Sequence, residues 1–297
     1  MDVFQGRNLL EFTEHFKTDD CCKEYLATIK WKDEFKCLKS SNKTSQIRKN
    51  FARTCNKCSH TETASANTLF HKVKFGLRKA FFICFEISTT TKSLSASYMG
   101  VRFGVAEKTA RLFMHKVREA MKFSENHPMK GNVHIDEFVV GGYEKGKSGR
   151  SYDSKKKKVV TTVELTDKGK IKRMYALKID NFSAKELEKI FTKHIDQNAT
   201  ITTDLWKGYR PLFKEYKITQ IKSDNGKNFM ALHTMNQQVK SWIRTTYSCV
   251  SDFNINRYLD EFCYRLNRSQ SKINIFDNLI QRMVKSDKIY KNKIICS

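Results

Sequence analysis

The chain has 297 residues and carries 56 Lys and Arg against 31 Asp and Glu, which gives a formal net charge of +25 at pH 7. A chain of this length buries enough apolar surface to fold without staples, so a disulfide-held miniprotein is excluded. The positive charge is spread along the whole sequence and favours a polyanionic partner such as nucleic acid. A basic surface that is only solvated is the alternative.

Secretion and membrane insertion have no signal in the sequence. No window reaches the apolar length that a membrane span requires, and the N-terminal residues MDVFQGRNLLEF lack a signal-peptide pattern. We therefore expect an intracellular protein without a membrane partner. In a reducing compartment, the nine cysteines favour metal binding where they cluster and core packing where they are scattered.

The N-terminal part combines a helix with a cysteine-bearing segment. The stretch CCKEYLATIKW at 21–31 predicts an amphipathic helix whose cysteines are packing residues. Residues 36–62 are polar and short-stranded, and they lack an apolar face large enough to fold unaided. Within them Cys37, Cys55 and Cys58 form a candidate metal group, because the last two have the two-residue gap of zinc ligands.

Two helical segments follow. Residues 77–87 predict a strongly apolar helix, and 93–122 predict two helices separated at Gly104. This layout fits a helix-turn-helix whose second helix enters the major groove of DNA, and an ordinary helical hairpin is the alternative. In the first reading the second helix offers three outward side chains to DNA, namely Lys108, Arg111 and His115.

After residue 130 the pattern changes to strands. Three β-rich runs joined by Gly and Lys turns predict an antiparallel meander, at 132–142, 156–166 and 171–179. A capping box formed by Ser183 and Glu186 then opens a helix. Two more strands and a helix follow, at 199–206, 216–223 and 235–247. This order predicts an α/β fold.

Two of these strands carry an acid in an apolar or β-branched context. Asp136 lies in the first strand and Asp204 closes the fourth. If the strands are neighbours, the two carboxylates converge and repel, and a hard divalent cation such as Mg²⁺ removes that cost. Such a site performs phosphodiester chemistry, whereas acids that cap turns or face solvent are the alternative. Glu137 should point to the opposite face of the strand and is the second-choice ligand.

The order of these motifs resembles one family. The runs HIDEFVVGG, TTDLWKGY, LHTMNQQVKSWIR and YLDEFCYRLNR, preceded by CLKS and CNKC, are similar to zinc-ribbon insertion-sequence transposases with a DDE-type catalytic core, of the insertion-sequence 1595 or ISXO-like type. The resemblance extends from about Cys21 to Asn267. It implies an RNase H-like mixed α/β sheet with flanking helices, preceded by a small zinc ribbon and a helix-turn-helix-like segment.

The resemblance also implies an activity. Such enzymes bind the terminal inverted repeats of a mobile DNA element, cut its ends with water as nucleophile, and join the freed 3′-hydroxyls to target DNA. They use Mg²⁺ or Mn²⁺, act on double-stranded DNA as homo-oligomers, and work in the bacterial cytoplasm at the nucleoid. By position, Asp136 and Asp204 match the first two metal-binding acids, with Trp206, Gly208 and Tyr209 in the signature that follows.

The third metal-site position departs from the family. The register that carries Asn, Glu and Trp in many relatives reads Asn236, Val239 and Trp242 here. Some branches use Asn as the third residue, which nominates Asn236, because its amide oxygen can ligate a hard cation. Lys240, one helical turn further along the same face, becomes a candidate phosphate contact.

The ribbon departs as well. The usual partner of Cys37 is replaced by Ser40, so three thiolates leave Zn²⁺ one ligand short of a tetrahedral set. His60 is close enough in sequence to complete a Cys3His site, and a solvent-facing loop histidine is the alternative. Two departures in one chain raise a second hypothesis, a decayed or domesticated relative that recognises repeat ends without cutting.

The remaining features complete the expected organisation. Lys147 and Arg150 lie in a basic loop that grips phosphates or is simply a solvated hairpin tip. Residues 258–268 predict a helix with one face against the sheet. We expect four segments, which are a helix and zinc-ribbon-like module at 1–62, a helical DNA-binding segment at 63–130, the RNase H-like core at 131–250, and C-terminal helices on that core at 251–297.

Overall fold

The computed structural model describes residues 2–142, 144–146, 154–247 and 249–294. Contacts divide the chain into two units, one formed by Met1–Met121 with Arg268–Ser297 and the other by Lys122–Asn267. The single C-terminal segment expected at 251–297 is therefore divided between the two units.

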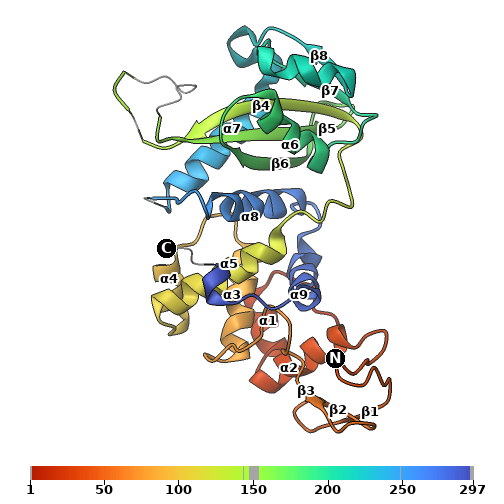
Figure 1. Ribbon diagram of the computed structural model, residues 1–297. Helices are drawn as coiled ribbons and strands as arrows, with labels where there is room; N and C mark the ends of the chain where they lie inside the picture. The colour runs from red at the N-terminus through yellow and green to blue at the C-terminus, as the bar shows by residue number, and fades with distance from the viewer. Residues whose placement is uncertain (1, 143, 147–153, 248, 295–297) are drawn as a thin grey trace. The chain divides into compact units, whose positions relative to one another are not determined.

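The second unit is built on a five-stranded mixed sheet (Figure 1). Its strand order is β6-β5-β4-β7-β8, in which β4, β5 and β6 form the antiparallel meander and β4, β7 and β8 run parallel. This is the RNase H-like fold that the motif order implied. The strands are β4 (Asn132–Val140), β5 (Lys157–Leu165), β6 (Ile171–Ile179), β7 (Thr200–Thr203) and β8 (Lys217–Gln220).

Helices cover both faces of this sheet because its central strands are apolar on both sides. One face packs against α6 (Ala184–His194) and the short helix η1 (Lys207–Lys214). The other packs against α7 (Met230–Arg244) and α8 (Ile255–Asn267). Along β4 the burial alternates, so that Ile135 belongs to the first core and Phe138 to the second. The short helix η2 (Asp224–Phe229) leads into α7.

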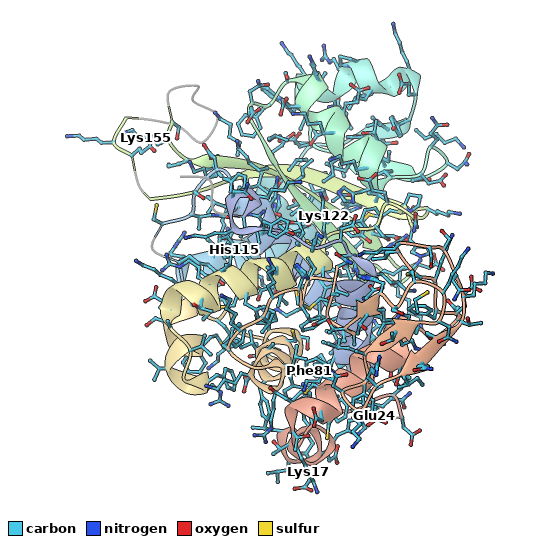
Figure 2. All side chains as sticks on the ribbon, turned by 60° about the horizontal axis from the view of Figure 1, so that its bottom comes forward. Lys17, Glu24, Phe81, His115, Lys122 and Lys155 are labelled. Carbon is cyan, nitrogen blue, oxygen red and sulfur yellow. The ribbon has the colours of Figure 1, made fainter. Side chains whose placement is uncertain are left out.

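The first unit is helical and has an aromatic core. Rings from three helices meet there, with Phe12 and Phe276 at 5.0 Å and Phe16 and Phe81 at 5.0 Å between centroids. Figure 2 shows Phe81 among the side chains of its helix. The helices are α1 (Leu9–His15), α2 (Asp19–Lys30), α3 (Leu77–Thr89), α4 (Ala96–Phe103), α5 (Glu107–Met121), α9 (Ile275–Lys285) and the short η3 (Lys272–Asn274) and η4 (Lys291–Lys293).

A tight turn joins α4 to α5. Gly104 ends α4 in the left-handed conformation at φ 58°, a conformation that glycine adopts at little cost. The two helices also approach closely at Gly100, where an added Cβ would lie 2.7 Å from the carbonyl oxygen of Val105. These two glycines therefore produce the helix pair expected from the sequence, and their geometry suits a helix-turn-helix.

A small antiparallel sheet carries the cysteine segment. It consists of β1 (Ser45–Ile47), β2 (Arg53–Cys55) and β3 (Thr61–Glu62) in that order. Lys30 of α2 anchors β3 and the residues after it, because its ammonium contacts Glu62 Oε1 at 2.6 Å and the carbonyl oxygen of Ala66 at 2.6 Å. Within the described ranges, no helix is both long and apolar enough to cross a bilayer.

Candidate active site

The sheet brings the two predicted acids together. Strands β4 and β7 are parallel neighbours, and Ile135 pairs with Thr203 at the last matched position. Asp136 and Asp204 are the next residues along the chain, so they lie side by side where β7 ends against the middle of β4. Carboxylate oxygens of Asp136, Glu137 and Asp204 lie within 4.8 Å of one another.

Glu137 joins this group although strand alternation predicts the opposite face. The alternation itself holds, since Ile135 packs in the core against α6 and Phe138 in the core against α7. Strand β7 ends at Thr203, and a longer side chain can reach the acids past that end. The expectation that Glu137 points away from the site is therefore wrong for its carboxylate.

Tyr209 lies on the inner side of the acids. Burial, and then the negative charge of Glu137, raise the pKa of its hydroxyl well above the ordinary value. The phenol therefore stays protonated beside the carboxylates at neutral pH. The resemblance placed Tyr209 in the segment after the second acid, and the structure places its hydroxyl near Glu137, Asp136 and Asp204.

The loop after β7 holds Asp204 in place. The backbone N–H of Trp206 donates to Asp204 Oδ1 at 2.9 Å, and Gln220 of β8 donates to the carbonyl oxygen of Asp204 at 2.8 Å. The indole of Trp206 lies so close to Gly208 that an added Cβ there would be 2.4 Å from Nε1. The spacing Trp-x-Gly in this loop thus has a steric reason.

Asn236 contacts the first acid through its amide nitrogen. Its Nδ2 donates to Asp136 Oδ2 at 3.0 Å, while its Oδ1 accepts from the hydroxyl of Thr161 at 2.7 Å. Asn236 is 4% exposed, so both partners are needed to satisfy the buried amide. Thr161 occupies one of the two lone pairs of the amide oxygen that is predicted to bind a cation, while the amide nitrogen orients the carboxylate of Asp136.

His233 is a further neighbour of the acids and was not among the site residues predicted from the sequence. Its Nε2 lies 3.5 Å from Asp136 Oδ2, and it precedes Asn236 by three residues on α7. Gly226, at φ 90°, makes room for the imidazole, because an added Cβ would lie 2.6 Å from Nδ1. The three-residue spacing from Asn236 was the signal in the sequence, since such pairs share a helix face.

Val239 is fully buried in the core between α7 and the sheet. A glutamate at this position would bring a carboxylate into an apolar cluster. Asn236 is the residue of that register that contacts Asp136. Val239 therefore packs in the core at the position where many relatives have Glu.

Lys240 completes this face of α7. Its ammonium lies 5.2 Å from the ring centroid of Phe138. Burial lowers the pKa of Lys240, and the negative charge of Asp136 opposes that effect. Lys240 therefore lies near Asp136, and its contact with phosphate remains a prediction.

One comparison with known proteins bears on this site. Residues 128–267 match the model of the ISXO2-like transposase domain. The chain contains an ISXO2-like transposase domain. No curated protein matches the chain at a significant level. The matched range begins just before β4, ends with α8, and includes every residue of the acid site described above.

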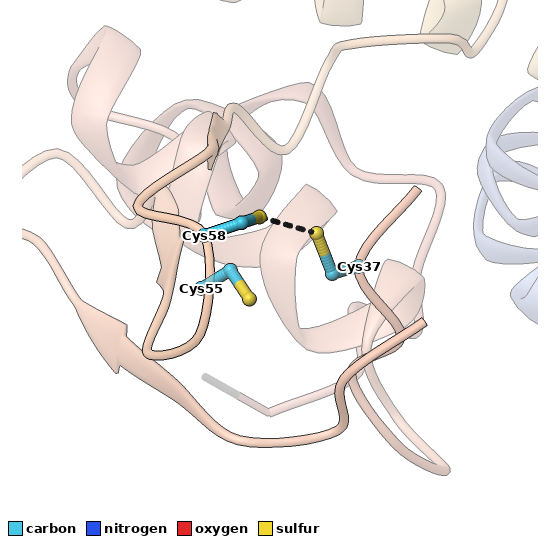
Figure 3. A group of neighbouring side chains, drawn as sticks. All are labelled: Cys37, Cys55 and Cys58. Carbon is cyan, nitrogen blue, oxygen red and sulfur yellow. Dashed lines mark hydrogen bonds between the residues drawn. The ribbon is translucent and has the colours of Figure 1, made fainter. Parts of the chain in front are cut away.

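Three cysteines outside the matched range form a second candidate metal centre. Sulfur atoms of Cys37, Cys55 and Cys58 lie within 4.8 Å of one another, and those of Cys37 and Cys58 are 3.5 Å apart (Figure 3). Backbone N–H groups of Lys39 and Lys57 each donate to the sulfur two residues earlier, at 3.4 Å. The two turns are therefore built alike, which suits a zinc ribbon.

Ser40 occupies the place of the fourth ligand. Its Oγ lies 3.3 Å from Cys55 Sγ, and its hydroxyl is the main reason that the pKa of the Cys55 thiol falls to about 6. His60 is not part of the group of sulfur atoms, and its backbone carbonyl accepts from the N–H of Cys55 at 2.9 Å. The sulfur group therefore has a hydroxyl, and no imidazole, at its fourth corner.

The residues expected to contact DNA have different surroundings. Lys108 and Arg111 are exposed on α5, where Arg111 pairs with Glu107. His115 is 2% exposed, so the expectation that it faces outward is wrong. It lies on the stripe of α5 that is buried together with Met114 and Arg118. Lys147 and Arg150 lie outside the described residues.

Replacement of Asn236 by Asp tests whether the transposase domain holds a cation. A further carboxylate beside Asp136 adds repulsion, so Asn236→Asp should lower the thermal midpoint without divalent ions by several degrees, for a cost of about 1 to 3 kcal/mol. Mg²⁺ or Mn²⁺ should then raise the midpoint more than in the parent protein. Asn181→Asp is the control, because its oxygen caps the Ser183 N–H away from the acids. Equal metal responses in all three proteins would contradict a cation site.

Replacement of Ser40 by Cys tests the fourth corner of the cysteine group. A fourth thiolate completes the tetrahedral set, so Ser40→Cys should slow the release of Zn²⁺ to a chelator at least about tenfold, given the binding energies of such sites. Ser65→Cys adds a thiol outside the group and should leave the release rate unchanged. An unchanged rate for Ser40→Cys would mean that residue 40 does not face the ion.

Proposed function

We propose that this protein is the DNA transposase of an insertion sequence, which binds terminal inverted repeats, cuts the DNA strand and transfers the freed end to target DNA. The observation that carries the proposal is the group of three carboxylates at the end of β7 and the adjacent middle of β4. A net charge of +25 supports a polyanionic substrate.

The acids have the composition of a site for Mg²⁺ or Mn²⁺. Hard divalent cations prefer carboxylate oxygens, and Asp136 and Asp204 supply them from two strands. We infer that Glu137 is the third oxygen ligand, because its carboxylate lies within 4.8 Å of the other two. Asn236, the candidate named from the sequence, acts through its hydrogen bond to Asp136.

The chemistry follows from these groups. A bound divalent cation would supply positive charge that stabilises phosphodiester hydrolysis and transfer. Lys240 adds a cation on the same side as Asp136 and neutralises substrate phosphate. His233 Nε2 lies 3.5 Å from Asp136 Oδ2 and is close enough to exchange a proton with that oxygen. Asn236 donates to the carboxylate of Asp136 and is itself held by Thr161, so the two residues keep the acid oriented.

DNA recognition belongs to the other unit in this proposal. Helix α5 follows α4 after a three-residue turn and exposes Lys108 and Arg111 near its start, which is the arrangement of a recognition helix. The cysteine sheet would bind Zn²⁺ through Cys37, Cys55 and Cys58. The first three segments expected from the sequence, the homo-oligomer on DNA and the nucleoid location remain parts of the proposal.

Metal-dependent nicking tests the proposal directly. With labelled DNA that contains the repeat ends flanking the reading frame, the parent protein should cut only when Mg²⁺ or Mn²⁺ is present. Asp136→Asn and Asp204→Asn should each reduce cutting by at least about 100-fold, because one ligand of the cation is lost. Asp167→Asn, in the exposed turn after β5, is the matched control and should cut normally.

The same experiment separates the second hypothesis. Sequence-specific binding of the repeat ends without cutting by the parent protein would favour a DNA-binding relative that has lost catalysis. Binding without preference for repeat ends, and no metal-dependent cutting, would contradict both hypotheses.

A further inference from the structure

A cavity of about 410 Å³ lies next to the acid site. Its walls come from the end of β4, the start of β5, the C-terminal half of α7 and the loop after α7. This volume is within the usual range of small-ligand sites. Lys240 lines the cavity and also interacts with Asp136, so the cavity and the acid site are adjacent.

The rim of the cavity is cationic. Lys155, Lys157, Lys240 and Arg244 line it, and among the described residues no acidic side chain does. Asp252 forms an ion pair with Lys157 at 2.8 Å, which neutralises one of the four charges. Figure 2 shows Lys155 reaching outward from the molecule, while Lys240 stands at the end nearest the acids. The rim thus offers positive charge to a phosphate chain at its outer and inner ends.

The inner wall is apolar and contains an aromatic ring. Val140, Ile243 and Val250 line it together with Tyr247. The ring of Tyr247 packs in a tilted arrangement against Tyr258, with 4.2 Å between centroids, and also contacts Trp242 at 5.8 Å. These contacts hold the ring in a fixed position. Apolar and aromatic walls bind the flat face of a nucleobase without reading its sequence.

The combination distinguishes between two forms of DNA. A paired duplex presents phosphates and sugars outward and keeps its base faces stacked inside, so it satisfies the cations but leaves the apolar wall uncovered. An unpaired nucleotide satisfies both, with its base against the wall and its phosphates on the rim.

We propose that this cavity binds one unpaired nucleotide of the DNA strand beside the scissile phosphate. The inference rests on the proposed function and adds to it a site for a nucleotide that has left the duplex. Arg244 and Lys155 hold its phosphates, and Tyr247 with the neighbouring valine and isoleucine side chains covers its base. Unpairing costs a few kcal/mol, and the cavity offsets part of this cost next to the reacting strand.

Cys249 provides a reporter for the test. This thiol is exposed and lines the cavity, so a bound nucleotide should slow its alkylation. The full chain is saturated with DNA in the absence of divalent ions, and alkylation by iodoacetamide is followed for each cysteine by peptide mass spectrometry. One duplex ends in a single unpaired nucleotide and the other is blunt with the same sequence. Cys21, half-buried on α2, is the internal control.

The expected result is at least fivefold slower alkylation of Cys249 with the unpaired end than with the blunt duplex, and no difference at Cys21. The double variant Lys155→Ala with Arg244→Ala should lose this protection, whereas Lys168→Ala, in the exposed turn after β5, should keep it. Equal rates with both duplexes, or protection that persists in the double variant, would overturn the proposal.

This measurement is independent of cutting. Protection of Cys249 in a protein that fails to nick DNA would contradict the proposed transposase activity and still support the nucleotide site. Metal-dependent nicking without protection of Cys249 would support the transposase activity and contradict the nucleotide site.

Discussion

Electrostatic repulsion among three carboxylates is the constraint around which the transposase domain is arranged. Parallel pairing of β4 with β7 brings Asp136 and Asp204 side by side where β7 ends, and the carboxylate of Glu137 lies close to theirs. The chain as a whole has a net charge of +25, so this cluster of negative charge stands out against a basic background. Like charges at this distance are costly unless a cation lies between them, so the fold maintains an arrangement that is favourable only with a positive partner.

The surroundings of the acids keep them in place without neutralising them. Asn236, itself held by Thr161, donates to Asp136, and the backbone of Trp206 donates to Asp204. Neutral donors orient a carboxylate but leave its charge available to a cation. Tyr209 stays protonated beside Glu137 because burial and that negative charge raise its pKa. Positioning and charge are thus supplied by different residues, which explains why Asn236 is buried while Lys240 remains partly exposed.

The fold could be predicted further from the sequence than the details of the site. Strand alternation and the order of elements depend on local periodicity, and they led to the sheet and to the neighbouring positions of Asp136 and Asp204. The capping box predicted before α6 was wrong, because the Ser183 side chain makes no cap hydrogen bond and Glu186 accepts from the N–H of Asp180. The roles of Asn236, His115 and Glu137 depend on which way one side chain turns, and that depends on distant neighbours. The Thr161 hydroxyl donates to the amide oxygen of Asn236, and His115 is buried in the packed stripe of α5. Strand β7 ends at Thr203, beyond which the side chain of Glu137 can reach the other acids. The position of the His60 ring also depends on its surroundings, since proximity in sequence did not bring the ring into the group of cysteines.

The central claim is that Asp136 and Asp204 hold one shared divalent ion. Diffraction from crystals of the protein grown with Mn²⁺, collected at a wavelength where manganese scatters anomalously, tests it most directly. The account predicts an anomalous peak within bonding distance of both carboxylates, and its loss in crystals of Asp204→Asn. Crystals of the parent protein with Mn²⁺ bound elsewhere, or with a peak that contacts only one of the two acids, would contradict it.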